Sequence, residues 1–191
     1  MYFKEHLYTR GLRPWHNVWI DHEKELISFP IYTTNKKLIG YQRYNWQESS
    51  KRNNVGRYFT HITPEYRAVG CYGLEHINDY GPIFIVEGIW DCLRVRNCYY
   101  NCLAVLTNTP HKQLIWLINN IYYGRQIIVI QDNDKNKAGN KLASGFSSAI
   151  MVPDGYKDIN EMEQDECSIW LCHKLSELRH NENTKNRGNI R

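Results

Sequence analysis

The sequence PIFIVEG at residues 82–88 decides the fold of this chain. In it an apolar, largely β-branched run ends abruptly at a carboxylate, and the same arrangement returns in IIVIQDND at residues 127–134. Short apolar runs without alternation are typical of strands buried on both faces of a parallel sheet. Helical patterns separate the two runs, as βαβ crossovers require. The sequence therefore predicts an α/β fold with a mainly parallel sheet flanked by helices.

Acidic side chains follow each predicted strand of this sheet. Glu87 ends the first strand, Asp91 comes about one helical turn later, and Asp132 and Asp134 end the second strand. A further run at residues 149–152 leads to KDINE at residues 157–161, which contains Asp158. Ligands of open α/β sheets bind at the carboxyl ends of the strands. Because hard oxygen ligands favour Mg²⁺ or Mn²⁺, we expect a divalent-metal site for phosphate chemistry at this edge.

Three motifs in this region resemble the Toprim domain, the metal-binding domain of DnaG-type primases, topoisomerases and some nucleases. They are EGIWD at residues 87–91, DND at 132–134 and KDINE at 157–161. The resemblance implies that the catalytic residues are Glu87, Asp132, Asp134 and Lys157. It also implies two Mg²⁺ or Mn²⁺ ions held by Glu87, Asp91, Asp132, Asp134 and Asp158. Glu87 would either complete the metal shell or act as a base, and Asp91 and Asp158 would be outer ligands.

The first eighty residues resemble the N-terminal part of the DnaG-type, and especially bacteriophage-type, primase catalytic core. The matching fragments are RGL at 10–12, FPI at 29–31 with GYQR at 40–43, RYFT at 57–60 and YGL at 72–74. Together with the Toprim motifs they cover about residues 5–165. The resemblance implies an α+β subdomain whose basic residues face the metal cluster across a cleft.

The basic residues of the chain are unevenly distributed. Residues 35–67 contain seven Lys and Arg against two Glu, whereas the formal net charge of the whole chain is only +4. A basic segment beside an acidic metal cluster suits a polyanion held by one part and processed by the other. The candidates for nucleic-acid or nucleotide binding are Arg43, Lys51, Arg52, Arg57, Lys135 and Lys137. The last two open a predicted helix, where backbone amides favour phosphate.

Aromatic residues alternate with these bases, and two interpretations stay open for them. The residues are Tyr41, Tyr44, Trp46, Tyr58 and Phe59. They stack on single-stranded bases, or they pack the core of their own subdomain.

The predicted elements follow from apolar periodicity, turn residues and caps. We predict helices at 4–9, 89–97, 112–121 and from 135 to 141, and strands at 25–31, 38–44, 57–61, 82–86, 103–106, 126–131 and 149–152. Residues 45–56 are predicted to be a loop. The predicted division is a basic subdomain at 1–80, a Toprim domain at 81–165, a helix at 166–180 and a disordered tail at 181–191.

The six cysteines contain no CxxC pair and lack zinc spacing, so we expect free thiols, a reducing cytoplasm and no bound zinc. Cys167 fits instead an apolar helical stripe with Trp170, Leu171, Leu175 and Leu178. No signal peptide and no membrane span are expected.

The sequence thus favours a DNA primase that makes short RNA primers on single-stranded DNA during phage replication. Its partners would be the template, ribonucleoside triphosphates and a replicative helicase or a separate zinc-ribbon chain, since the chain shows no zinc ribbon. Asn160 stands where bacterial primases tend to carry a second acid. The alternatives are a Toprim nuclease and a catalytically weak module that binds nucleic acid or a replication partner.

Overall fold

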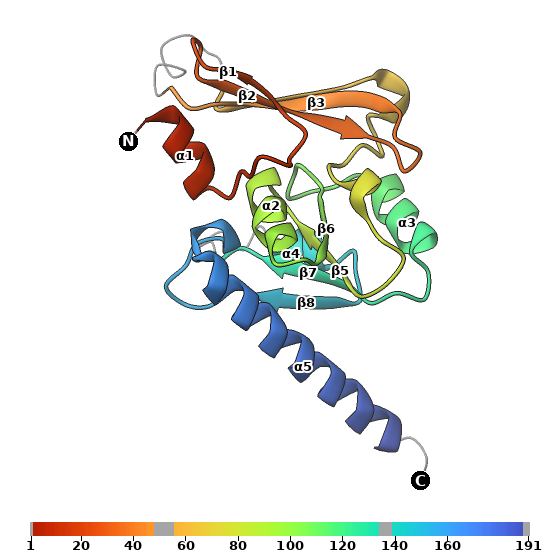
Figure 1. Cartoon of the computed structure of the whole chain (residues 1–191). Coiled ribbons are helices and arrows are strands. Elements are labelled where there is room, and N and C mark those ends of the chain that lie inside the picture. The colour runs from red at the N-terminus through yellow and green to blue at the C-terminus, as the bar shows by residue number, and fades with distance from the viewer. Residues whose placement is uncertain (1, 48–55, 134–138, 189–191) are drawn as a thin grey trace.

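The structure is a computed structural model that describes residues 2–47, 56–133 and 139–188, with side chains described to residue 181. Two four-stranded sheets form separate layers, with helix α2 (Ile89–Asn97) between them, and helix α5 (Gln164–Gly188) extends away from the body (Figure 1).

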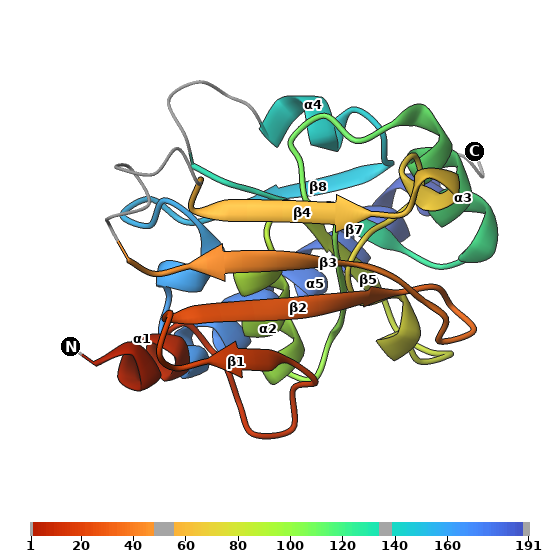
Figure 2. The same cartoon turned by 90° about the horizontal axis from the view of Figure 1, so that it is seen from above.

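The first sheet is antiparallel. It consists of β1 (Trp19–Asp21), β2 (Leu26–Tyr32), β3 (Leu38–Asn45) and β4 (Tyr58–Ile62), paired in the order β1-β2-β3-β4 (Figure 2). Strands β2 and β3 form the predicted hairpin, and helix α1 (Phe3–Thr9) precedes the sheet. Strand β1 was not predicted, because three residues are too short to show a period of two.

The second sheet is parallel throughout, as predicted. Its strands are β5 (Ile83–Val86), β6 (Asn101–Ala104), β7 (Ile127–Gln131) and β8 (Ser148–Met151), in the order β6-β5-β7-β8. The crossovers are α2, α3 (Lys112–Ile121) and a segment that contains α4 (Gly139–Ala143). Short 3₁₀ turns lie at Pro64–Tyr66, Leu74–His76 (η3) and Ile159–Glu161 (η4).

Both faces of the parallel sheet are buried, which explains its unbroken apolar runs. Phe84 and Ile128 pack with α2 and α5 on one face, while Ile85 and Val129 pack with α3 on the other. The antiparallel sheet closes over α2, where the Trp90 ring lies edge-on to Phe29 with centroids 5.1 Å apart. The two layers therefore share one apolar core.

Several predicted boundaries differ from the structure. Strand β6 lies two residues earlier than predicted, because the buried Asn101 side chain is satisfied by Asn78 and Tyr80 and so begins the strand. Helix α5 runs through Gly188, so residues 181–188 are helical and not disordered as predicted. Each residue added to an existing helix gains a backbone hydrogen bond, so a polar composition does not end it. The predicted loop and helix also include residues 48–55 and 135–138, which lie outside the described residues.

The predicted helical stripe is confirmed, since Cys167, Leu171 and Leu175 are buried and Trp170 and Leu178 pack against the same core. All six cysteines are free thiols. Within the described part of the chain, no helix is long and apolar enough to cross a bilayer.

Candidate active site between the two sheets

A pocket of about 380 Å³ lies where the antiparallel sheet meets the carboxyl ends of the parallel strands. Its lining residues come from five segments of the chain. They are Gln42, Tyr58 and Thr60 from β3 and β4, Glu87, Gly88 and Asp91 from the β5–α2 connection, Leu106 after β6, and Asp132 after β7.

Strand order brings Glu87 and Asp132 to this pocket. Each follows its strand directly, and β5 and β7 are parallel neighbours with Ile83 opposite Ile127. The carboxyl ends of neighbouring parallel strands meet at one edge, so the two carboxylates line one pocket. Asp134 lies outside the described residues.

Asp91 is buried in the first turn of α2, and its carboxylate folds back towards the start of the helix. The backbone amide of Asn160 donates a hydrogen bond to Asp91 Oδ1 over 3.3 Å. A Cβ atom at Gly88 would lie 2.7 Å from Asp91 Oδ2. Glycine at position 88 therefore leaves room for the carboxylate, a role that the sequence analysis did not predict.

Burial raises the pKa of Asp91 well above its ordinary value, and the negative charges of Asp158 and Asp132 raise it further. Arg10 opposes this effect. Three carboxyl groups from the ends of different strands therefore interact electrostatically. A cation between them would relieve both the burial and the repulsion.

Asp158 and Lys157 belong to the loop after β8, which contacts the end of β7. The backbone amide of Asn133 donates to the Lys157 carbonyl over 2.8 Å. Burial raises the pKa of Asp158, and the negative charge of Glu161 raises it further. Asp158 Oδ1 accepts a hydrogen bond from the Glu161 backbone amide. The side chain of Lys157 is exposed and is not part of the pocket lining.

The donor set fits a hard divalent cation, but it is partial. Among the residues that the structure describes, no three His, Cys, Asp or Glu side chains converge as a closed metal cage would require. Mg²⁺ is commonly bound by one or two carboxylates together with waters and substrate phosphates. Glu87, Asp91 and Asp132 around an open pocket match this kind of site.

Arg10 is the main residue that sequence reasoning missed. Its Nε donates to Asn160 Oδ1 over 3.0 Å, and its guanidinium lies 4.8 Å from the centroid of the Trp90 ring. It lowers the pKa of both Asp91 and Asp158. Arg10 belongs to the RGL fragment that the sequence analysis noted. No local pattern, however, indicated that its charge would act on a carboxylate eighty residues away.

The two described arginines among the predicted nucleic-acid residues lie on different faces of the antiparallel sheet. Gln42 faces the pocket, so Arg43 points to the outer face, where it lies 5.3 Å from the Phe59 ring centroid. The expectation that Arg43 faces the carboxylates is therefore wrong. The exposed Arg57 lies 6.0 Å from the ring centroid of Tyr44, whose side chain points into the core.

The other four bases, Lys51, Arg52, Lys135 and Lys137, fall outside the described residues. Core packing is confirmed for two of the aromatic residues, and stacking on bases stays a prediction for the exposed ones. Tyr44 is fully buried and Trp46 packs against the core, whereas Tyr41 and the exposed Phe59 contact each other on the outer face.

Leu106 reaches the pocket with a positive φ of 64°, a conformation that costs about 1–2 kcal/mol for a residue with a side chain. Its amide donates to the Glu87 carbonyl over 2.9 Å. This hydrogen bond holds Glu87 at the end of β5 and offsets part of the strain of the Leu106 backbone.

No protein family and no curated sequence matches the chain, but solved primase structures share its fold. A DnaG primase catalytic domain bound to ssDNA has a TM-score of 0.63 at 17% identity, covering 91% of this chain and 58% of that one. The Aquifex aeolicus primase, with zinc-binding and RNA polymerase domains, has a TM-score of 0.62 at 20% sequence identity, and the match covers 89% of this chain and 44% of that one. The primase fragment of the bacteriophage T7 primase-helicase has a TM-score of 0.55 at 16% sequence identity, and the match covers 78% of this chain and 62% of that one.

The chain therefore has the fold of a DnaG-type primase catalytic core, as its motifs had predicted. It spans about half the length of the primase chains that it matches.

Proposed function

We propose that this chain contains the polymerase centre of a DNA primase, which joins ribonucleotides on a single-stranded DNA template. The observation that carries the proposal is the meeting of Glu87, Asp91 and Asp132 at one pocket of a primase-type fold. In this proposal residues 81–165 are a Toprim domain, and the protein acts in phage replication.

The carboxylates Glu87, Asp91, Asp132, Asp134 and Asp158 would hold Mg²⁺ or Mn²⁺. Bound there, two such ions would activate the primer 3′-hydroxyl and neutralise the charge of the departing pyrophosphate. The Leu106 amide holds the backbone of Glu87 in place for this role, and Gly88 leaves room for the Asp91 carboxylate.

Positive and neutral groups complete the proposed centre. Arg10 lies near Asp91 and Asp158, where its positive charge limits their repulsion. Gln42 donates to the Thr60 hydroxyl over 2.8 Å, so these two side chains form a neutral polar wall opposite the carboxylates. Such a wall orients a nucleotide without competing for its phosphate charge.

Further contacts belong to the proposal. Arg57 and Lys157 would contact nucleotide phosphates at the rim, with Lys157 assisting the reaction. Lys51, Arg52, Lys135 and Lys137 would bind template and triphosphate. A helicase or a separate zinc-bearing chain would supply template recognition.

Primer synthesis tests this function. Wild-type protein with Mg²⁺, single-stranded DNA and labelled ribonucleotides should yield oligoribonucleotides. Asp132→Asn should reduce the yield by at least about 100-fold because metal binding is lost, yet it should still bind the DNA. Asp154→Asn, which changes an exposed acid in a nearby turn, is the matched control and should retain activity.

Two outcomes would contradict the primase proposal. Metal-dependent shortening of the template would indicate a nuclease. DNA binding with no chemistry in the wild-type protein, under conditions where a known primase works, would indicate a binding module.

Metal binding can be measured separately from activity. Adding Mn²⁺ at about 100 times its dissociation constant stabilises a protein by about 2.7 kcal/mol, which corresponds to about 5–10 °C in the melting temperature for a chain of this size. EDTA should reverse the shift, and Asp91→Asn should reduce it. If the melting temperatures of Asp91→Asn and Asp132→Asn rise with Mn²⁺ as much as that of the wild type, the metal binds elsewhere.

A further inference from the structure

Asn160 joins three segments of the chain next to the candidate active site. It lies in the η4 turn after β8 and is only 8% exposed. Its Oδ1 accepts a hydrogen bond from Arg10 Nε over 3.0 Å, while its Nδ2 donates to the carbonyls of Arg10 over 2.8 Å and Trp90 over 3.2 Å. Because Arg10 Nε can only donate and the two carbonyls can only accept, the position requires both an acceptor and donors. Asparagine provides both, whereas an ionised aspartate or a leucine of similar size does not.

The backbone of Asn160 contacts helix α2 as well. Its amide donates to Asp91 Oδ1 over 3.3 Å, and its carbonyl accepts a hydrogen bond from Arg94 Nη2 over 3.1 Å. Asp158 begins the same turn and caps it through the Glu161 amide. The contacts of Asn160 therefore set the position of the turn that carries Asp158 relative to the helix that carries Asp91.

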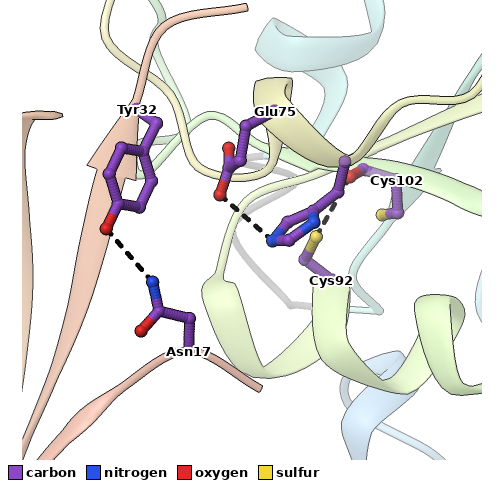
Figure 3. Close-up of polar contacts among 6 residues, drawn as sticks. Asn17, Tyr32, Glu75, Cys92 and Cys102 are labelled. Atoms are coloured by element: carbon purple, nitrogen blue, oxygen red, sulfur yellow. Dashed lines mark hydrogen bonds and ion pairs between the residues drawn. The ribbon is translucent and has the colours of Figure 1, made fainter. Parts of the chain in front are cut away.

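Helix α2 and the η4 turn are each held in the fold by other contacts. On the side of α2 that faces β6, the buried Cys92 thiol donates to the Cys102 carbonyl over 3.3 Å (Figure 3). In the turn and directly after it, Ile159 and Met162 are buried in the apolar core. Removing the Asn160 side chain should therefore leave both elements folded and change only how they are positioned relative to each other.

We propose that Asn160 is a positioning residue for the metal centre, which keeps the Asp91 and Asp158 carboxylates together for a divalent cation. The inference rests on the proposed function, because it requires a metal at these carboxylates. Without a cation the two negative charges repel each other. The contacts of Asn160 resist this repulsion, so a cation meets carboxylates that are already in place. Loss of a partner that holds metal ligands in this way typically costs about 10- to 100-fold in metal affinity.

Calorimetric titration of the folded protein with Mn²⁺, in the absence of nucleotide, tests the proposal. Asn160→Ala should weaken Mn²⁺ binding at least about 10-fold. Asn160→Ser should weaken it by a smaller factor, because the serine hydroxyl and a water can replace some of the lost hydrogen bonds. Primer synthesis by Asn160→Ala should recover when the Mn²⁺ concentration is raised by the factor that the titration gives.

Asn101→Ala is the matched control, because Asn101 is a similarly buried amide far from the pocket. It is 7% exposed and begins β6, at the edge of the parallel sheet opposite the carboxyl ends of the strands. Its Nδ2 donates to Asn78 Oδ1 over 2.9 Å and to the Tyr80 carbonyl over 2.7 Å. Asn101→Ala should lower the melting temperature as Asn160→Ala does, yet it should leave the Mn²⁺ affinity unchanged.

Wild-type Mn²⁺ affinity in Asn160→Ala, with a melting temperature lowered as in Asn101→Ala, would overturn the proposal and leave Asn160 with a structural role alone. If Asn160→Ala does not fold, wild-type affinity in Asn160→Ser would have the same meaning. Failure of the proposed function would give a different result. The wild-type protein would then bind Mn²⁺ no better than Asp132→Asn does, and the inference about Asn160 would fall with the metal centre.

Discussion

Arg10 illustrates how single residues determine the candidate active site. It follows helix α1, yet its guanidinium contacts Asn160, 150 residues away in the chain, and lies over the Trp90 ring. Its Nη1 also lies 3.4 Å from the Tyr58 hydroxyl of the antiparallel sheet. One cation thus connects both layers and counteracts the repulsion between Asp91 and Asp158.

Replacing Arg10 with Met should lower the free energy of unfolding by about 2–4 kcal/mol, because a partly buried cation–π contact and two hydrogen bonds are lost. Urea denaturation measures the change. Arg67→Met, which alters an exposed arginine, should change stability by about 0.5 kcal/mol or less. If the two variants are equally stable, Arg10 does not connect the layers.

The acidic residues themselves were predictable because each follows an apolar run that is recognisable on its own. The position of Glu87 and Asp132 directly after buried strands was enough to predict that they line the pocket, and the helical repeat was enough for Asp91. Gln42 was not predictable as a pocket residue, and Arg10 was not predictable as a neighbour of the pocket, because their proximity to the carboxylates depends on how the layers stack.

At the level of elements, the pairing of β3 with β4 decides which side chains reach the pocket. Gly40 pairs with Ile62 and Gln42 with Thr60, so Thr60 and Tyr58 face the carboxylates while Phe59 faces outward. The strands approach most closely at Gly40, where a Cβ atom would lie 2.1 Å from the His61 carbonyl oxygen. Only glycine permits this approach.

Gly40→Ala should therefore separate β4 from β3 and lower the free energy of unfolding by about 2 kcal/mol or more. Primer synthesis should fall as well, since Tyr58 and Thr60 would leave the pocket wall. Hydrogen exchange of the β4 amides would report the separation directly. Gly56→Ala, whose added Cβ meets only a carbonyl at 3.4 Å, is the control and should behave as the wild type. Unchanged β4 protection in Gly40→Ala would contradict the strand pairing.

The elements predicted best from sequence were those with a complete local signal. Helices α2 and α3 have the predicted bounds, since each has several turns and clear end signals. Strands β1 and β6 were missed or shifted because they are short and their ends depend on hydrogen bonds with distant partners.

For the whole molecule, the buried His16 and the half-buried His6 link stability to pH. Burial and the charges of Arg10 and Arg57 lower the pKa of His6 to about 4, and burial with nearby cations does the same for His16. The ring of His16 accepts a hydrogen bond from the Arg13 amide, which a protonated ring could not do. In the unfolded chain these two histidines take up protons near the ordinary histidine pKa of 6.5. In the folded chain both rings stay neutral until about pH 4.

The contribution of these two residues to stability is therefore complete above about pH 6.5 and is lost as the pH falls towards 4. Denaturation at a series of pH values should show this loss. A variant with His6→Gln and His16→Asn should show a smaller decrease between pH 6.5 and 4 than the wild type, and the exposed His173→Asn should not. Parallel curves for the double variant and the wild type would disprove the linkage.

The sequence by itself determined the parallel sheet, its crossover helices and the carboxylates at one edge, because buried strands and the residues that end them are specified by neighbours in the chain. Only the tertiary structure decided that the charge of Arg10 acts on Asp91 and that Arg43 faces away from the carboxylates. These facts depend on strand register and on the stacking of two sheets, which bring together residues up to 150 positions apart. No local pattern encodes contacts over that distance.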